Sequence, residues 1–263
     1  MTQEEKAAEF RSLHESEPFI IPNPWDAGSA RALEALGFKA LATTSSGFAF
    51  TLGRADGKAT LDEVCTHVAA LDRATSLPIS VDLENGYGAS PDAAAAAIRR
   101  VAKAGAVGGS IEDWDEENGI YPIEQAVERV AAAVEAARGL SFPFMLTARA
   151  ENYVRDNPDL DNTIARLQAY QQAGADVLYA PRVNSIDEIR AICESVSKPV
   201  NVLAHAGFTT QMIVEAGGRR ISVGGQLTWV AAAAMVSAAE RMRDEGDFSD
   251  LAVSIPLDDW VGD

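Results

Sequence analysis

Short apolar segments alternate with longer amphipathic segments along almost the whole chain. The apolar segments contain β-branched or aromatic residues and lie next to glycine or proline, a pattern that is typical of buried strands. We expect eight strands, at Phe19–Pro22, Ala40–Thr43, Ile79–Leu83, Val107–Ile111, Phe144–Thr147, Val177–Tyr179, Val200–Leu203 and Ile221–Val223.

The amphipathic segments between these strands predict helices. Several of them end in a glycine, such as Gly37 or Gly105, which can adopt the left-handed conformation that terminates a helix. Ser90 followed by Pro91 is typical of a helix start. The expected helices are Ala27–Leu36, Leu61–Arg73, Asp92–Ala104, Ile123–Ala137, Asp161–Ala173, Ser185–Ser195, Thr209–Ala216 and Gln226–Asp244.

Strands that alternate with helices pair in parallel through right-handed crossovers. Eight such repeats in 263 residues predict an α/β fold, a single (β/α)8 TIM-type barrel over residues 1–263 with short polar N-terminal and C-terminal extensions. An open doubly wound sheet is the alternative. We favour the barrel because no glycine-rich dinucleotide fingerprint follows the first strand.

The charge balance excludes some classes of partner. The chain has 22 Lys and Arg residues against 39 Asp and Glu residues, a formal net charge of −17, so we expect neither nucleic acid nor a membrane as partner. The N-terminal segment is polar and lacks the apolar core of a signal peptide. The two cysteines, Cys65 and Cys193, are far apart and form no metal-binding motif. These features predict a cytoplasmic protein.

Polar residues follow the ends of the expected strands, where barrel enzymes carry their chemistry. Six strands lead directly into such residues, at Thr43–Ser46, Asp82–Asn85, Glu112–Asp113, Arg149–Asn152, Arg182 and Asn201. The sequence therefore predicts one polar rim at the carboxyl ends of the strands.

Three carboxylates stand out on this rim. Asp82 and Glu84 are two residues apart, so on a strand they would share a face, and Glu112 comes from the next strand. Such a group requires a divalent cation, a shared proton or arginine partners. An all-oxygen set favours Mg²⁺ or Mn²⁺ over zinc. The alternative is that these acids cap helices and pair with arginines.

Other rim residues have two interpretations each. Ser45, Ser46 and Gly47 could cradle a carboxylate through backbone N–H groups, or could form an ordinary connection. Arg149 could clamp an anionic substrate or pair with Glu151. The last of these residues is Asn201, which could equally be a satisfied core amide.

Several motifs in order resemble those of the isocitrate lyase/phosphoenolpyruvate mutase superfamily. The third-strand pattern Asp82-Leu83-Glu84-Asn85-Gly86-Tyr87-Gly88, with Ile111-Glu112-Asp113 one unit later, is the specific part. The remaining matches are Asn23–Ala27, Thr43–Gly47, Leu52–Gly57 and Thr147–Arg149.

This resemblance implies a Mg²⁺-dependent barrel, with Mn²⁺ as a possible replacement, that acts on a small 2-oxo acid or phosphonate. It makes Asp82 the nearest metal ligand, in contact with substrate, and gives Glu84 and Glu112 metal-bound waters. Asp56 completes that shell, and Asp56 and Arg149 are the catalytic candidates. By the same match, the substrate is bound by Ser45, Ser46, Gly47, Arg149 and Asn201, with Trp25 as a wall of the pocket.

The implied reaction cleaves or forms a C–C or P–C bond next to the carbonyl of the 2-oxo acid through an enolate intermediate. The chain lacks the lyase motif K-[KR]-C-G-H, and residues 114–121 contain neither Cys nor Lys. A lyase, decarboxylase or hydrolase of small acids is therefore expected. The alternatives are a phosphoenolpyruvate/carboxyphosphonate mutase-like enzyme and a non-catalytic 2-oxo acid binding protein. The resemblance also implies a homodimer or homotetramer.

Overall fold

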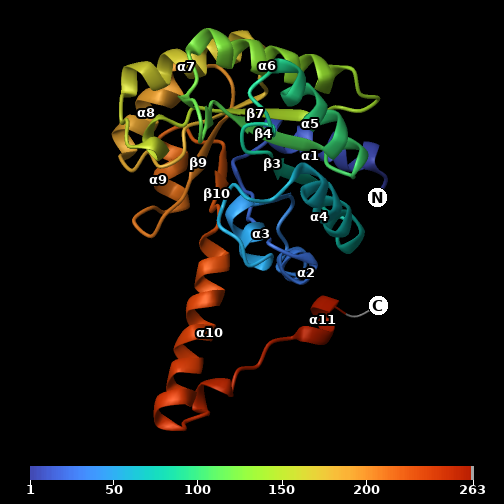
Figure 1. The fold of residues 1–263 in the computed structure, drawn as a ribbon, viewed down its shortest axis with the longest axis vertical. Helices are drawn as coiled ribbons and strands as arrows, with labels where there is room; N and C mark the ends of the chain where they lie inside the picture. The colour runs from blue at the N-terminus through green and yellow to red at the C-terminus, as the bar shows by residue number, and fades with distance from the viewer. Residues whose placement is uncertain (262–263) are drawn as a thin grey trace.

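Eight parallel strands form the centre of the molecule (Figure 1). A computed structural model describes residues 1–261, so the expected domain range extends two residues beyond the described part. The strands are hydrogen-bonded in the order β1-β10-β9-β8-β7-β4-β3-β2. Their bounds are β1 Phe19–Ile20, β2 Leu41–Ala42, β3 Ile79–Asp82, β4 Gly108–Glu112, β7 Met145–Arg149, β8 Val177–Tyr179, β9 Val200–Leu203 and β10 Arg220–Ser222. All eight expected strands are confirmed, with ends within two residues.

Asn23 joins the first and last strands of this order, and thereby closes the barrel. The backbone of Ala42 donates to the Pro22 carbonyl at 3.0 Å, next to the end of β1. The buried Asn23 side chain donates to the Thr43 carbonyl at 3.1 Å and accepts from the N–H groups of Val223 and Gly224, both at 2.9 Å. The prediction of a closed (β/α)8 barrel is confirmed.

The expected helices surround this barrel. Each one is present with its ends shifted by one residue at most, because capping residues and glycines mark helix ends clearly in this sequence. The observed bounds are α2 Ala27–Ala35, α4 Leu61–Ala74, α5 Pro91–Lys103, α6 Ile123–Arg138, α7 Leu160–Gln172, α8 Ile186–Ser195, α9 Thr210–Glu215 and α10 Gln226–Glu245.

Several further elements were not expected. The N-terminal segment, expected as a polar extension, forms α1 (Gln3–Glu15), whose Ala7 and Phe10 are fully buried against the barrel. The turn after β2 is a short helix, α3 (Ser45–Thr51), and a hairpin of β5 (Trp114–Asp115) and β6 (Gly119–Ile120) follows β4. Three short elements complete the chain, η1 Asn152–Arg155, η2 Ser249–Leu251 and α11 Leu257–Val261.

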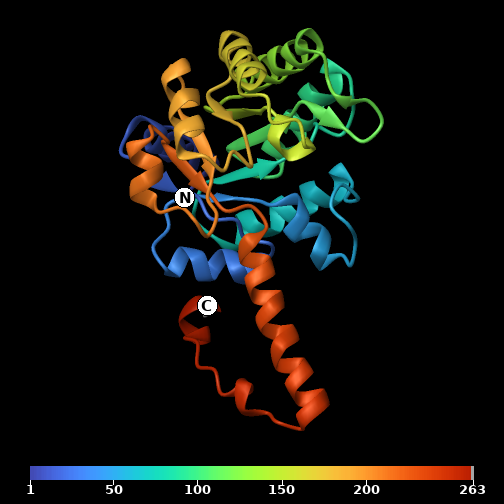
Figure 2. The same ribbon diagram turned by 90° about the vertical axis from the view of Figure 1, so that its left-hand side faces the viewer.

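Helix α10 leaves the body of the molecule and projects away from it (Figures 1 and 2). Thr228, in its first turn, is the buried residue of this helix, and Trp229, beside it, packs edge-to-face on Phe50 with ring centroids 5.5 Å apart. The chain then folds back, and α11 packs against α2. Among residues 1–261, no helix combines the length and the apolar character that crossing a membrane would require.

Replacement of the barrel-closing amide should destabilise the fold. The change Asn23→Ala leaves the Val223 and Gly224 N–H groups without their acceptor, and we expect a loss of about 3 kcal/mol in the free energy of unfolding. Urea unfolding followed by circular dichroism measures this loss. Asn157→Ala, at an exposed position, is the control and should leave the midpoint unchanged. Equal midpoints for the two variants would contradict the closing role of Asn23.

Candidate active site at the carboxyl ends of the strands

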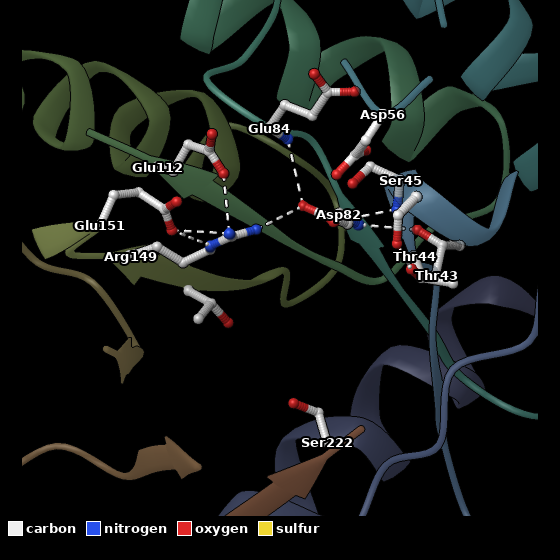
Figure 3. Close-up of polar contacts among 12 residues, drawn as sticks. Thr43, Thr44, Ser45, Asp56, Asp82, Glu84, Glu112, Arg149, Glu151 and Ser222 are labelled. Carbon is white, nitrogen blue, oxygen red and sulfur yellow. Dashed lines mark hydrogen bonds and ion pairs between the residues drawn. The ribbon is translucent and has the colours of Figure 1, made fainter. Parts of the chain in front are cut away.

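Asp82, the last residue of β3, lies at the centre of the polar rim (Figure 3). Its backbone N–H donates to Thr43 Oγ1 at 2.9 Å. Its Oδ2 accepts from the backbone N–H of Ser45 at 3.2 Å, and its Oδ1 accepts from Arg149 Nη1 at 2.9 Å. One carboxylate therefore connects the start of α3 to the end of β7.

Arg149, at the end of β7, brings three carboxylates together. Besides Asp82, its guanidinium contacts Glu112 Oε2 at 3.0 Å and Glu151 Oε1 at 2.8 Å. Burial raises the pKa of Glu112 and of Glu151, and the charge of Arg149 opposes that increase. Burial lowers the pKa of Arg149, but the charges of Glu151, Glu112 and Asp82 together raise it well above its ordinary value. Arg149 is thus a permanent cation.

Glu84 lies apart from this group, because β3 ends at Asp82. Glu84 adopts a left-handed backbone conformation (φ 49°), and its side chain points toward Asp56 (Figure 3). The prediction that Asp82 and Glu84 share a strand face is therefore wrong. Burial, together with the charges of Asp82 and Asp56, raises the pKa of Glu84 to about 7.

The expected metal ligands do not form a ready-made set of direct ligands. Within residues 1–261, no group of three or more His, Cys, Asp or Glu side chains converges to hold a metal ion. Asp82 and Glu112 have the arginine partner that the alternative interpretation required. Neither Asp56 nor Glu84 forms an ion pair in this part of the chain, and the raised pKa of Glu84 reflects unbalanced negative charge. Oxygen donors with such a charge fit a hydrated divalent cation better than zinc.

The Ser45-Ser46-Gly47 segment is the first turn of α3 rather than an open turn. Ser45 N–H donates to Asp82, and Gly47 N–H donates to Thr44 Oγ1 at 3.3 Å, so two of the expected carboxylate-binding groups already have partners. A Cβ atom at Gly47 would lie 2.6 Å from Thr228 Oγ1 and 3.3 Å from Trp25 Cβ. Glycine is therefore required where α10 and Trp25 approach this turn.

Two cavities open beside Asp82 and Arg149. An inner cavity of about 60 Å³ extends into the barrel and is lined in part by Thr43, Thr44 and Asn201. An outer cavity of about 870 Å³ includes Ser45, Asp56, Glu84 and Glu112 in its lining. Trp25, Ser46 and Gly47 do not line either cavity.

Asn201 lies on β9 and is buried in the barrel. Its Nδ2 donates to Ser222 Oγ at 2.9 Å, and its Oδ1 accepts from Arg220 Nε at 2.8 Å. The side chain has the partners expected of a core amide, and it also faces the inner cavity.

Some residues of the site were not expected from the sequence. Thr43 orients the backbone of Asp82, and Arg155 contacts Glu112 and Glu151 at 3.3 and 3.4 Å. The Arg155 guanidinium also lies 3.2 Å from the ring centroid of Trp114. The spacing of Glu151 and Arg155, four residues apart, was the available signal, but a four-residue spacing indicates a contact only in a helical turn.

Neutralising Glu151 should weaken the fold. Glu151 is fully buried between Arg149 and Arg155, so Glu151→Gln should cost about 3 kcal/mol in the free energy of unfolding. Glu116→Gln, which removes an exposed carboxylate paired with Lys58, is the matched control and should have no measurable effect on the midpoint. Urea unfolding at pH 7 tests both variants. A Glu151 variant as stable as the control would show that the buried carboxylate is not needed.

Comparison with known proteins identifies the relatives of this chain. The family model described as phosphoenolpyruvate phosphomutase matches residues 10–243. An uncharacterised protein of Mycobacterium tuberculosis is 33% identical over 249 residues, which are 94% of this chain and 92% of the relative. The 2-methylisocitrate lyase of Escherichia coli is 31% identical over 202 residues, which are 73% of this chain and 67% of the lyase.

Solved structures give the same assignment. A Burkholderia cenocepacia structure provisionally assigned as a lyase/mutase has a TM-score of 0.96 at 48% identity, over 99% of this chain and 97% of the other. An oxaloacetate acetylhydrolase solved with its product oxalate has a TM-score of 0.88 at 25% identity, with 98% and 94% covered. A phosphonopyruvate hydrolase solved with oxalate and Mg²⁺ has a TM-score of 0.85 at 21% identity, with 97% and 92% covered, and at that identity the likeness shows the fold alone.

Proposed function

Because the chain belongs to the phosphoenolpyruvate mutase/isocitrate lyase superfamily of enzymes, we propose that it uses Mg²⁺ to cleave or form a C–C or P–C bond beside the carbonyl of a small 2-oxo acid. The reaction proceeds through an enolate, and its type is that of a lyase, decarboxylase or hydrolase. The chain acts as one barrel domain.

The contacts of Asp82 are the observation that carries this proposal. Asp82 meets both the Ser45 N–H and the Arg149 guanidinium, at the point where the inner and outer cavities adjoin. A small acid that enters there has an acidic side on Asp56 and Glu84 and a basic side on Arg149. This polarity suits a molecule that binds a cation through its oxygens and carries a negative charge elsewhere.

Each side of the site has a separate role in the proposal. Asp82 would hold the cation directly, with Glu84, Glu112 and Asp56 holding it through water. When bound, Mg²⁺ supplies positive charge next to the oxygen on which the enolate charge develops. Arg149, which remains protonated, holds the anionic end of the substrate. Ser46, beside α10, and Asn201, in the inner cavity, complete the contacts to the substrate.

The hairpin of β5 and β6 favours chemistry on a small substrate. It is short and contains neither Cys nor Lys, and Lys58 reaches it from outside through an ion pair with Glu116 at 2.9 Å. An acetylhydrolase of the same fold acts on oxaloacetate, and its product is oxalate. Hydrolysis or decarboxylation of a small 2-oxo acid therefore fits this chain better than cleavage of methylisocitrate.

A substrate screen tests the proposal. Oxaloacetate, phosphonopyruvate and substituted malates are offered to the protein with Mg²⁺, and products are followed by proton and phosphorus NMR. We expect turnover of at least one compound, and Asp82→Ala should lower it by about 100-fold or more, because the direct ligand is lost. Chelation of the metal should abolish turnover. Asp161→Ala, at the exposed start of α7, is the control and should retain full activity.

The same screen distinguishes the alternatives. Conversion of phosphoenolpyruvate to a phosphonate would favour a mutase-like enzyme. Tight binding of oxalate by calorimetry without any product would favour a 2-oxo acid binding protein. Absence of both binding and turnover would reject the proposed substrate class.

Association of identical copies through α10 belongs to the same proposal. The alanine-rich segment 93–97 packs on α6 within the chain, whereas the alanine-rich segment 230–239 leaves the body. Val230 and Met235, in the second of these segments, are 66% and 62% exposed. A surface of this kind on a helix of 20 residues suits contact with a second copy, giving a homodimer or homotetramer.

Charged residues on α10 should prevent this association. Val230→Glu combined with Met235→Glu should convert the oligomer to a monomer, because the glutamates would be buried without partners. Size exclusion with light scattering gives the molar mass. Glu240→Ala, an exposed change on the same helix, should leave the oligomer intact. A monomeric wild-type protein at micromolar concentration would contradict the association.

A further inference from the structure

Arg182 is the uncompensated cation of the outer cavity. Four basic residues line this cavity, and three of them are paired: Arg149 and Arg155 with Glu112 and Glu151, and Lys58 with Glu116. Within residues 1–261, Arg182 forms neither an ion pair nor a side-chain hydrogen bond, and it is exposed at the cavity. Its charge is therefore available to a ligand.

The backbone holds Arg182 in a strained position. Its φ angle is 62°, in the left-handed region that costs a non-glycine residue about 1–3 kcal/mol. Pro181 and Val183 on either side are buried, so the exposed arginine stands on a fixed base three residues after β8 ends. A surface arginine without a role would not require this conformation, because glycine or asparagine would adopt it at lower cost.

The opposite part of the lining is also basic and flat. The Arg155 guanidinium stacks on the Trp114 ring, and its buried Nε has no hydrogen-bond partner. Arg155 is held by Glu112 and Glu151, so its charge is mostly balanced. Arg182 therefore adds the net positive charge at this end of the cavity, away from the acidic side formed by Asp56 and Glu84.

We propose that Arg182 determines substrate specificity by binding a second anionic group, a carboxylate or a phosphonate, on the part of the substrate that departs. This inference rests on the proposed function, because it places the 2-oxo acid end of the substrate at Asp82 and Arg149. The guanidinium binds two oxygens of either anionic group at once. The substrates are then dianionic acids, and monoanionic 2-oxo acids such as pyruvate bind weakly.

Paired ligands test this role by calorimetry in the presence of Mg²⁺. Oxalate probes the inner end of the site alone, whereas difluorooxaloacetate and phosphonopyruvate also carry the distal anionic group. Arg182→Gln should weaken binding of at least one distal-group ligand by roughly tenfold, the usual loss for a charge-assisted hydrogen-bonded contact, and should leave oxalate within about twofold. Arg182→Lys should restore part of the loss. Arg190→Gln, an exposed arginine of α8 outside the cavity lining, is the control.

The outcomes separate this inference from the function on which it rests. Wild-type protein that fails to bind oxalate with Mg²⁺ overturns both. Oxalate binding together with equal effects of Arg182→Gln on all three ligands, or with no effect on any, overturns the role of Arg182 and leaves the function standing. A loss confined to difluorooxaloacetate supports a carboxylate as the distal group, and a loss confined to phosphonopyruvate supports a phosphonate.

Discussion

The ion pairs of Arg149 hold the candidate site together. Asp82, Glu112 and Glu151 come from the ends of β3, β4 and β7, and none of these carboxylates could remain charged and buried near the others without a cation. The guanidinium meets all three within 3.0 Å. The barrel supplies the positions of the acids, and this one side chain makes their proximity tolerable.

The same arrangement divides the rim into parts with different charge. Around Arg149 the acids and bases balance, whereas Glu84 and Asp56 face each other without an arginine, and Arg182 stands without an acid. An unbalanced acidic part and an unbalanced basic part in one cavity give a polarised site. A ligand that brings a cation at one end and an anion at the other would satisfy both parts.

Sequence reasoning located the rim but not the direction of its side chains. Asp82 and Arg149 each end a strand, and strand ends were readable from the apolar pattern and its polar continuation. Glu84 was misplaced because one residue in a left-handed conformation ends the alternation on which the prediction relied. Helix α1 was also missed, because its buried residues are few and lie among charged ones.

The sequence by itself determined the eight repeats, the parallel barrel and the family, because strand and helix periodicities and a specific motif are local properties of the chain. Only the tertiary structure decided which charges meet. Arg149 and Asp82 are 67 residues apart, and Asn23 closes the barrel on residues 200 positions later. No local pattern records such contacts, since they depend on how the strands are staggered around the barrel and on which way each turn directs a side chain.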